Sequence, residues 1–184
     1  MSSFEKKTVL ITGGASGIGL LSAQNYAKLG ANVVMVDYNQ EALDERVAEI
    51  KAYNENVLGI CIDIREYAKV EEACKQAYDT FGSITGAEGS PNGVAYATAK
   101  SALMHGTTLS IAQAGAKHNV RCVCLALGPI LTRPAMANMK TMLGRAGEVQ
   151  EVVDLILYVT GEDGAFMTGN TIYLDGGRNA LGRG

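Results

Sequence analysis

Apolar and polar residues alternate along the chain in a way that predicts strands and helices in turn. Short runs rich in Val, Ile and Leu predict strands at 7–12, 32–37, 57–64, 120–126 and 171–174. Apolar positions at helical spacing predict helices at 18–29, 40–53, 66–81, 95–117 and 149–159. Strands that are apolar along most of their length and alternate with helices are typical of a parallel sheet with helices on both faces.

The pattern therefore predicts an α/β fold with a doubly wound parallel sheet. Right-handed crossovers give the first three strands the order 3-2-1. The length of 184 residues, 47% of them apolar, suits a single domain. The chain shows no internal repeat and no flexible linker.

Composition narrows the possible partners. The net charge is only −3, and Lys and Arg are scattered without a basic tract, so we expect no nucleic-acid partner. The chain has no apolar run of 18 residues and no signal-peptide pattern, which predicts a cytoplasmic protein without a membrane span. Four cysteines include no CxxC pair, and the two histidines stand apart, so we expect neither disulfides nor a bound metal.

A glycine-rich turn, TGGASGIG, links the first predicted strand to the first predicted helix at residues 12–19. Backbone N–H groups at such a helix start, together with the helix dipole, favour a pyrophosphate. The candidate cofactor-binding residues here are Gly13, Ser16, Gly17, Ile18 and Gly19. A glycine turn of no chemical role would look similar, so the context of this turn decides between the two readings.

Two acidic residues at strand ends supply that context. Asp37 closes the second predicted strand, 18 residues beyond Gly19, where a carboxylate accepts hydrogen bonds from the adenosine ribose and repels a 2′-phosphate. Asp63 and Ile64 close the third predicted strand, where the adenine would lie. The alternative for Asp37 is a strand-end residue that caps the next helix. With the glycine turn in place, we predict NAD as the cofactor.

Tyr96 and Lys100 are four residues apart at the start of the predicted helix 95–117, so they share one helix face. A nearby ammonium favours the ionised form of a phenol, which would let Tyr96 act as a general acid or base. Two exposed side chains without a chemical role would show the same spacing.

The joint order of these motifs resembles the short-chain dehydrogenase/reductase family, whose fold is Rossmann-like. The resemblance rests on TGGASGIG, Asp37, Asp63-Ile64 and YATAK at 96–100, and it extends to LGPILT at 127–132 and DGG at 175–177. It implies that Ser83, 13 residues before Tyr96, orients the substrate oxygen. It also implies that Ile130 and Thr132 hold the nicotinamide amide.

The resemblance implies an enzyme that interconverts a secondary alcohol and its ketone by hydride transfer with NAD. Tyr96 would exchange the hydroxyl proton, and Lys100 would tune Tyr96 and hold a ribose hydroxyl. The partner would be a small alcohol or ketone that the sequence does not specify, and the enzyme would form a homotetramer.

The sequence departs from the family pattern between Gly82 and Ser83. The family has two more strands and a helix there, so the resemblance implies that fifty or more residues are missing. Without them, one edge of the first strand would have no partner. A smaller gap is expected near 136–142, where Met136, Met139 and Met142 would either line a substrate pocket or pack in a loop. A true deletion would leave a catalytically silent dinucleotide-binding module.

Overall fold

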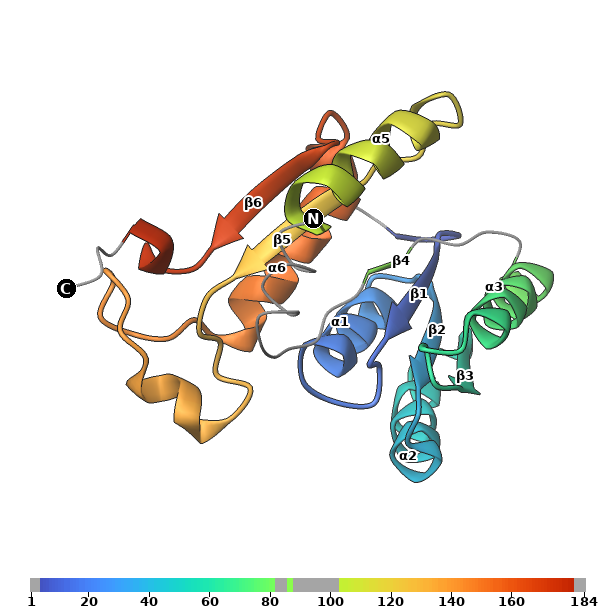
Figure 1. Ribbon diagram of the computed structural model, residues 1–184. Coiled ribbons are helices and arrows are strands. Elements are labelled where there is room, and N and C mark those ends of the chain that lie inside the picture. Colours follow the sequence, from blue (N-terminus) through green and yellow to red (C-terminus); the bar gives the residue numbers. More distant parts are fainter. Residues whose placement is uncertain (1–3, 82–85, 88–102, 181–184) are drawn as a thin grey trace. The chain divides into compact units, whose positions relative to one another are not determined.

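The computed structural model describes residues 4–81, 86–87 and 103–180 (Figure 1). The chain divides into two compact units, Met1–Gly89 and Ser90–Gly184, each of which is described by itself. In the described residues, no helix is both long enough and apolar enough to cross a membrane.

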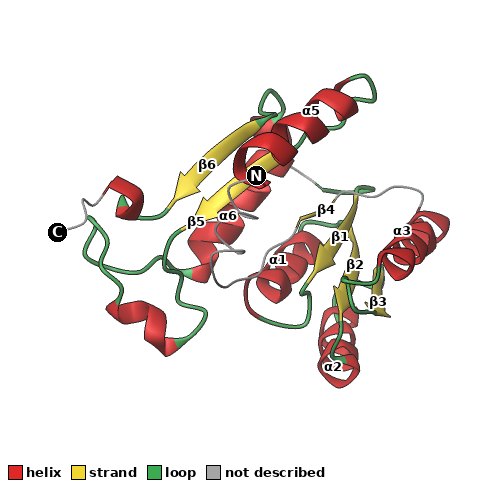
Figure 2. Ribbon diagram, viewed as in Figure 1, coloured by secondary structure: helices red, strands yellow, loops and turns green. Residues whose placement is uncertain are grey.

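The first unit is a parallel sheet with three helices (Figures 1 and 2). Its strands are β1 (Thr8–Thr12), β2 (Asn32–Asp37), β3 (Val57–Cys61) and β4 (Gly86–Ala87). Its helices are α1 (Gly17–Lys28), α2 (Gln40–Lys51) and α3 (Tyr67–Phe81). The strand order is β3-β2-β1-β4, so the predicted 3-2-1 arrangement is confirmed.

Strand β2 is the centre of this unit. Its residues Val33 to Val36 are at most 1% exposed, because the sheet is covered on both faces. On one face, Ala73 and Ala77 of α3 join a buried cluster with residues of β1, β2 and β3. On the other face, Leu43 of α2 packs over Gly59 of β3. The predicted doubly wound α/β architecture is therefore confirmed.

Leu43 offers a test of this packing. The side chain is fully buried, so Leu43→Ala should leave a cavity and lower the free energy of unfolding by about 2–5 kcal/mol. Urea unfolding followed by circular dichroism measures this change. Ala42→Gly on the same helix should cost only about 1 kcal/mol. Equal losses in the two variants would contradict the packing described for α2.

The second unit has two parallel strands, β5 (Val123–Leu127) and β6 (Asn170–Leu174), which pair with each other. Its longer helices are α5 (Thr108–Ala116) and α6 (Val149–Thr160). Short helical turns occupy Leu103–Thr107, Pro134–Asn138, Glu162–Gly164 and Arg178–Ala180. Every residue of β5 and β6 is at least partly exposed, unlike the buried core of β2.

Several predicted boundaries differ from the structure. Strand β3 ends at Cys61, so Asp63 and Ile64 lie in the loop that follows it. The predicted helix 95–117 is described only from Leu103, and its described part consists of a π-helical turn followed by α5. The predicted strand 120–126 begins only at Val123.

One prediction about the sheet is wrong. The second edge of β1 has a partner, because β4 pairs in parallel with Leu10 and Ile11. The predicted loop after Gly82 thus contains a two-residue strand. Pairing satisfies backbone groups of a buried strand that would otherwise lack hydrogen-bond partners.

Candidate dinucleotide site

The glycine turn has the backbone that its sequence requires. Gly13 and Gly17 have positive φ angles of 65° and 54°, a region that favours glycine. Helix α1 begins at Gly17, with Ser16 as its extended N-cap residue. The Ser16 side chain makes no capping hydrogen bond to the helix. The turn therefore presents a helix N-terminus of the kind that binds phosphate groups.

Gly19 allows the first turn of α1 to lie against the glycine turn itself. A Cβ atom at this position would lie 2.1 Å from the Gly13 carbonyl oxygen and 2.7 Å from the Gly13 carbonyl carbon. Both atoms are backbone, so no side-chain rotation would relieve the clash. Only glycine fits here without displacing the turn.

The Asp37 side chain lies at the end of β2, next to this turn. It is only 8% exposed. One carboxylate oxygen, Oδ2, accepts a hydrogen bond from the Ala15 N–H at 3.1 Å. The other, Oδ1, accepts one from the Asn39 N–H at 3.1 Å. The structure thus brings the predicted ribose-binding carboxylate and the predicted phosphate-binding turn into direct contact.

Capping of α2 falls to another residue. Asn39 is the N-cap of this helix, and its side-chain oxygen accepts a hydrogen bond from the Ala42 N–H at 3.1 Å. Asn39 therefore caps α2, which was the alternative role considered for Asp37.

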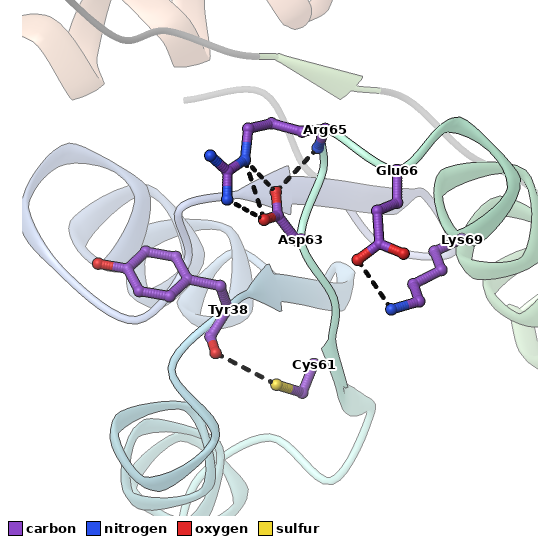
Figure 3. Close-up of polar contacts among 6 residues, drawn as sticks. All are labelled: Tyr38, Cys61, Asp63, Arg65, Glu66 and Lys69. Atoms are coloured by element: carbon purple, nitrogen blue, oxygen red, sulfur yellow. Dashed lines mark hydrogen bonds and ion pairs between the residues drawn. The ribbon is translucent and has the colours of Figure 1, made fainter.

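Asp63 is engaged by a neighbour that the sequence analysis did not single out. The Arg65 guanidinium donates to both carboxylate oxygens of Asp63, and the Arg65 backbone N–H donates to Oδ1 at 3.0 Å (Figure 3). These bonds lower the Asp63 pKa to about 2. The sequence signal for this pair was the D-x-R spacing, because an arginine two residues after an aspartate can reach back to its carboxylate across a turn.

Two apolar side chains near the ends of β2 and β3 are exposed. Ile64 is 37% exposed and Tyr38, which follows Asp37, is 81% exposed. The Cys61 thiol contacts the Tyr38 carbonyl at 3.5 Å, which ties the ends of β2 and β3 together (Figure 3). The carboxyl end of this sheet therefore offers an open surface with one aromatic ring and one paired arginine.

In the second unit, the predicted nicotinamide-binding segment follows β5. Ile130 is 6% exposed and forms a parallel bridge with Gly147. The Ile130 carbonyl accepts a hydrogen bond from the Thr132 N–H at 2.7 Å and lies 3.4 Å from the Thr132 hydroxyl. The contacts of this unit alone thus hold Ile130 and Thr132 in place.

A cavity of about 60 Å³ lies beside this segment. Its lining residues are Pro129, Ile130, Thr141, Leu143, Arg145, Gly147, Glu151, Leu174, Asp175 and Gly176. The predicted pocket methionines, Met136, Met139 and Met142, are not among them, and Met142 is 61% exposed.

Arg145 and Glu151 form a two-pronged ion pair at the rim of this cavity. The Arg145 guanidinium nitrogens lie 2.8 and 2.7 Å from the two carboxylate oxygens of Glu151. Glu151 also accepts a hydrogen bond from the Glu148 N–H at 2.7 Å as part of a capping box at the start of α6. Arg145 and this N–H lower the Glu151 pKa from 4.5 to about 2.

This depressed pKa predicts a defined pH window. A carboxyl group whose pKa is lower in the folded state stabilises the fold above its unfolded pKa, and that stabilisation is lost as pH falls through the folded pKa. Glu151→Gln should therefore lower the thermal unfolding midpoint at pH 7, with the difference from wild type shrinking between about pH 4.5 and pH 2. The exposed Glu55→Gln is the matched control. A difference that does not change with pH would contradict this assignment.

Three predicted catalytic residues, Ser83, Tyr96 and Lys100, lie outside the described residues. In the described part of the chain, no group of three or more His, Cys, Asp or Glu residues is placed to hold a metal ion. The four cysteines are free thiols.

Two family models match successive parts of the chain. Residues 7–86 match the family described as short chain dehydrogenase. Residues 80–179, more than half of the chain, match the family described as enoyl-(acyl carrier protein) reductase. The two matches meet at residues 80–86, which include Gly82 and Ser83.

Individual proteins show the same relationship. The chain is 26% identical to a 7alpha-hydroxysteroid dehydrogenase from Bacteroides fragilis over 249 residues, covering 96% of each chain. It is 26% identical to a probable 2,4-dienoyl-CoA reductase from Bacillus subtilis over 246 residues, covering 95% of this chain and 97% of the relative. The structure of L-sorbose reductase from Gluconobacter frateurii, complexed with NADPH and L-sorbose, has a TM-score of 0.85 at 19% identity, covering 97% of this chain and 98% of that one.

The first of these alignments is longer than the chain itself. Since the aligned region has 249 positions and the chain has 184 residues, at least 65 positions have no counterpart here. The relatives thus carry residues that this chain lacks. The two family matches, the relatives and the shared fold place the chain in the short-chain dehydrogenase/reductase family, a family of nicotinamide-dinucleotide-dependent oxidoreductases.

Proposed function

We propose that this protein is an NAD-dependent oxidoreductase that interconverts a secondary alcohol and its ketone by hydride transfer. The observation that carries the proposal is the contact between the Asp37 carboxylate and the glycine turn. A phosphate-binding turn and a ribose-binding acid must lie close together to hold one adenosine diphosphate moiety, and these two share a hydrogen bond.

The preference for NAD rests on the charge at the end of β2. A buried carboxylate at Asp37 would repel the 2′-phosphate of NADP and accept hydrogen bonds from the ribose hydroxyls of NAD. The exposed guanidinium of Arg65, in the loop after β3, is already paired with Asp63 (Figure 3). One relative of the same fold is described with NADPH, so both dinucleotides belong in the test.

The proposed catalytic roles rest on the family resemblance, and the chemistry of the residues supports them. Tyr96 exchanges the proton of the alcohol oxygen, Lys100 favours the ionised phenol, and Ser83 donates a hydrogen bond to the substrate oxygen. Ile130 and Thr132 hold the nicotinamide amide, and the Asp63–Ile64 loop lies beside the adenine. Bound NAD supplies the hydride acceptor, and the residues of this chain supply orientation and proton transfer.

A second candidate function follows from the 65 or more aligned positions that this chain lacks. We place the missing segment between Gly82 and Ser83, where the two family matches meet and where β4 covers only two residues of β1. A chain that truly lacks this segment would be a dinucleotide-binding module without turnover. The intact mass of the cellular protein distinguishes the two, since an uninterrupted enzyme would be several kilodaltons heavier than 19.4 kDa.

We also propose that the chain forms a single domain, that the protein is cytoplasmic and that it assembles as a homotetramer. Helix α5 of the second unit carries two apolar side chains, Leu109 and Ile111, that are each about half exposed. A homotetramer that packs through this helix would cover one or both of these side chains. Size-exclusion chromatography with light scattering tests the oligomeric state.

The activity itself is tested by mixing the protein with NAD, and separately with NADP, and a panel of hydroxysteroids, sugar alcohols and small cyclic alcohols. The absorbance of the reduced nicotinamide reports turnover. We expect turnover with NAD for at least one alcohol class. Binding of NAD without any turnover would favour the silent module, and preferred use of NADP would overturn the cofactor assignment.

A further inference from the structure

The Asp37 carboxylate accepts hydrogen bonds from two backbone N–H groups, which points to a structural role in addition to ribose binding. It is 8% exposed, and it accepts hydrogen bonds from the N–H groups of Ala15 and Asn39 at 3.1 Å each. Ala15 belongs to the glycine turn, and Asn39 is the N-cap of α2. One side chain therefore joins the loop after β1 to the loop after β2.

A second hydrogen bond joins the glycine turn to the sheet. Its Gly14 N–H donates to the Val36 carbonyl of β2 at 3.1 Å. Gly13 and Gly17 flank this region with positive φ angles, and glycines lose more conformational freedom on folding than other residues. An unanchored turn of this composition would sample many backbone shapes. The bond from Ala15 to Asp37 is charge-assisted and buried, which makes it stronger than the backbone bond from Gly14 to Val36.

The anchored residue directly precedes the phosphate-binding groups. Ser16, Gly17 and the first turn of α1 follow Ala15 along the chain. A displacement of Ala15 would therefore move the N–H groups that face the pyrophosphate. Anions are held by such groups only when several N–H vectors converge.

We infer that Asp37 is a positioning residue for the glycine turn, whose carboxylate holds Ala15 so that the phosphate-binding N–H groups converge. This inference rests on the proposed dinucleotide-binding function and adds a role to Asp37. A residue that only selects the ribose would discriminate between NAD and NADP. A residue that also positions the turn is needed for both.

Hydrogen exchange without any cofactor tests the positioning role separately from function. In Asp37→Asn, the side chain keeps its size but loses its charge and one of its two acceptor oxygens. We expect amide exchange in residues 13–20 to rise by about fivefold or more relative to wild type, while residues 33–36 of β2 keep their protection. Asp44→Asn is the matched control, because Asp44 is an exposed carboxylate of the same unit whose contact is to Gln40.

Two results would overturn the inference. One is equal exchange in residues 13–20 of Asp37→Asn and Asp44→Asn. The other result comes from the wild-type protein alone, in which the inference requires the Ala15 N–H to be protected from hydrogen exchange. Exchange of this amide at the rate of an unstructured peptide would overturn the inference even if Asp37→Asn failed to fold.

Titration with NADH and NADPH separates positioning from selection. We expect Asp37→Asn to weaken NADH binding by about tenfold and to leave NADPH affinity without a gain, because loss of turn positioning offsets the relief of repulsion at the 2′-phosphate. A gain in NADPH affinity with unchanged exchange in residues 13–20 would assign Asp37 to selection alone. If the wild-type protein bound neither dinucleotide, the proposed function would fail, and the exchange measurement would still decide whether Asp37 holds the turn.

Discussion

Replacement of Tyr96 by Phe is expected to abolish most of the turnover and to leave NADH binding intact. The variant lacks only the phenolic oxygen, so the loss should report proton transfer. General acid–base groups contribute roughly 10²–10⁴-fold to the rate, and we expect a fall in kcat of that size. Steady-state kinetics with the best alcohol of the panel measures this change, and fluorescence titration with NADH measures binding.

Tyr78→Phe is the control for this substitution. Tyr78 lies on α3 and is 61% exposed, so removal of its hydroxyl should not change turnover. The pH profile gives a second readout. Loss of the charge in Lys100→Met should move the profile of kcat to higher pH, because the phenol loses the cation that favours its ionised form. Tyr96→Phe with wild-type kcat would remove Tyr96 from the mechanism.

A methyl group at Gly19 is expected to have the second large effect. In Gly19→Ala, the added Cβ would lie 2.1 Å from the Gly13 carbonyl oxygen, so the turn or the helix must move. Hydrogen bonds to charged groups contribute about 1.5–3 kcal/mol each, so displacement of the N–H groups that face the pyrophosphate should lower NADH affinity by about 100-fold. Calorimetric titration measures the affinity, and circular dichroism shows whether the fold persists.

Gly106→Ala provides the matched control. It adds the same methyl group at a glycine where, among the described residues outside its own helical turn, no atom lies within 4 Å of the added Cβ. NADH affinity in this variant should equal that of wild type. An unchanged affinity in Gly19→Ala would mean that the glycine turn does not form the phosphate site.

The sequence predicts the first unit well because its signals are local and continuous. Strand β2 is buried on both faces, so every residue from Val33 to Val36 is apolar, and the pattern is visible without knowledge of its neighbours. The positive φ angles of Gly13 and Gly17 likewise follow from residue type.

Other features depend on contacts that no local pattern encodes. The bond from Ala15 to Asp37 joins residues 22 positions apart and involves a backbone N–H that any residue type would supply. Pairing of β4 with β1 likewise depends on tertiary context, because Gly86 and Ala87 have no strand propensity of their own. The engagement of Asp63 by Arg65 lies in a loop that hydrophobic periodicity had assigned to a strand.

The catalytic residues and the cofactor site are assigned on different grounds. Ser83, Tyr96 and Lys100 are predicted from spacing and family resemblance, and they lie outside the described residues. The glycine turn and Asp37 have observed geometry. Experiments on the dinucleotide site therefore bear most directly on what the structure contains.

The central claim is that this chain of 184 residues binds a nicotinamide dinucleotide through the glycine turn and Asp37. Calorimetric titration of the purified chain with NADH tests it most directly. The account predicts saturable binding of one NADH per chain, weakened about 100-fold in Gly19→Ala. Absence of binding in a folded wild-type protein, or equal affinity in Gly19→Ala, would contradict it.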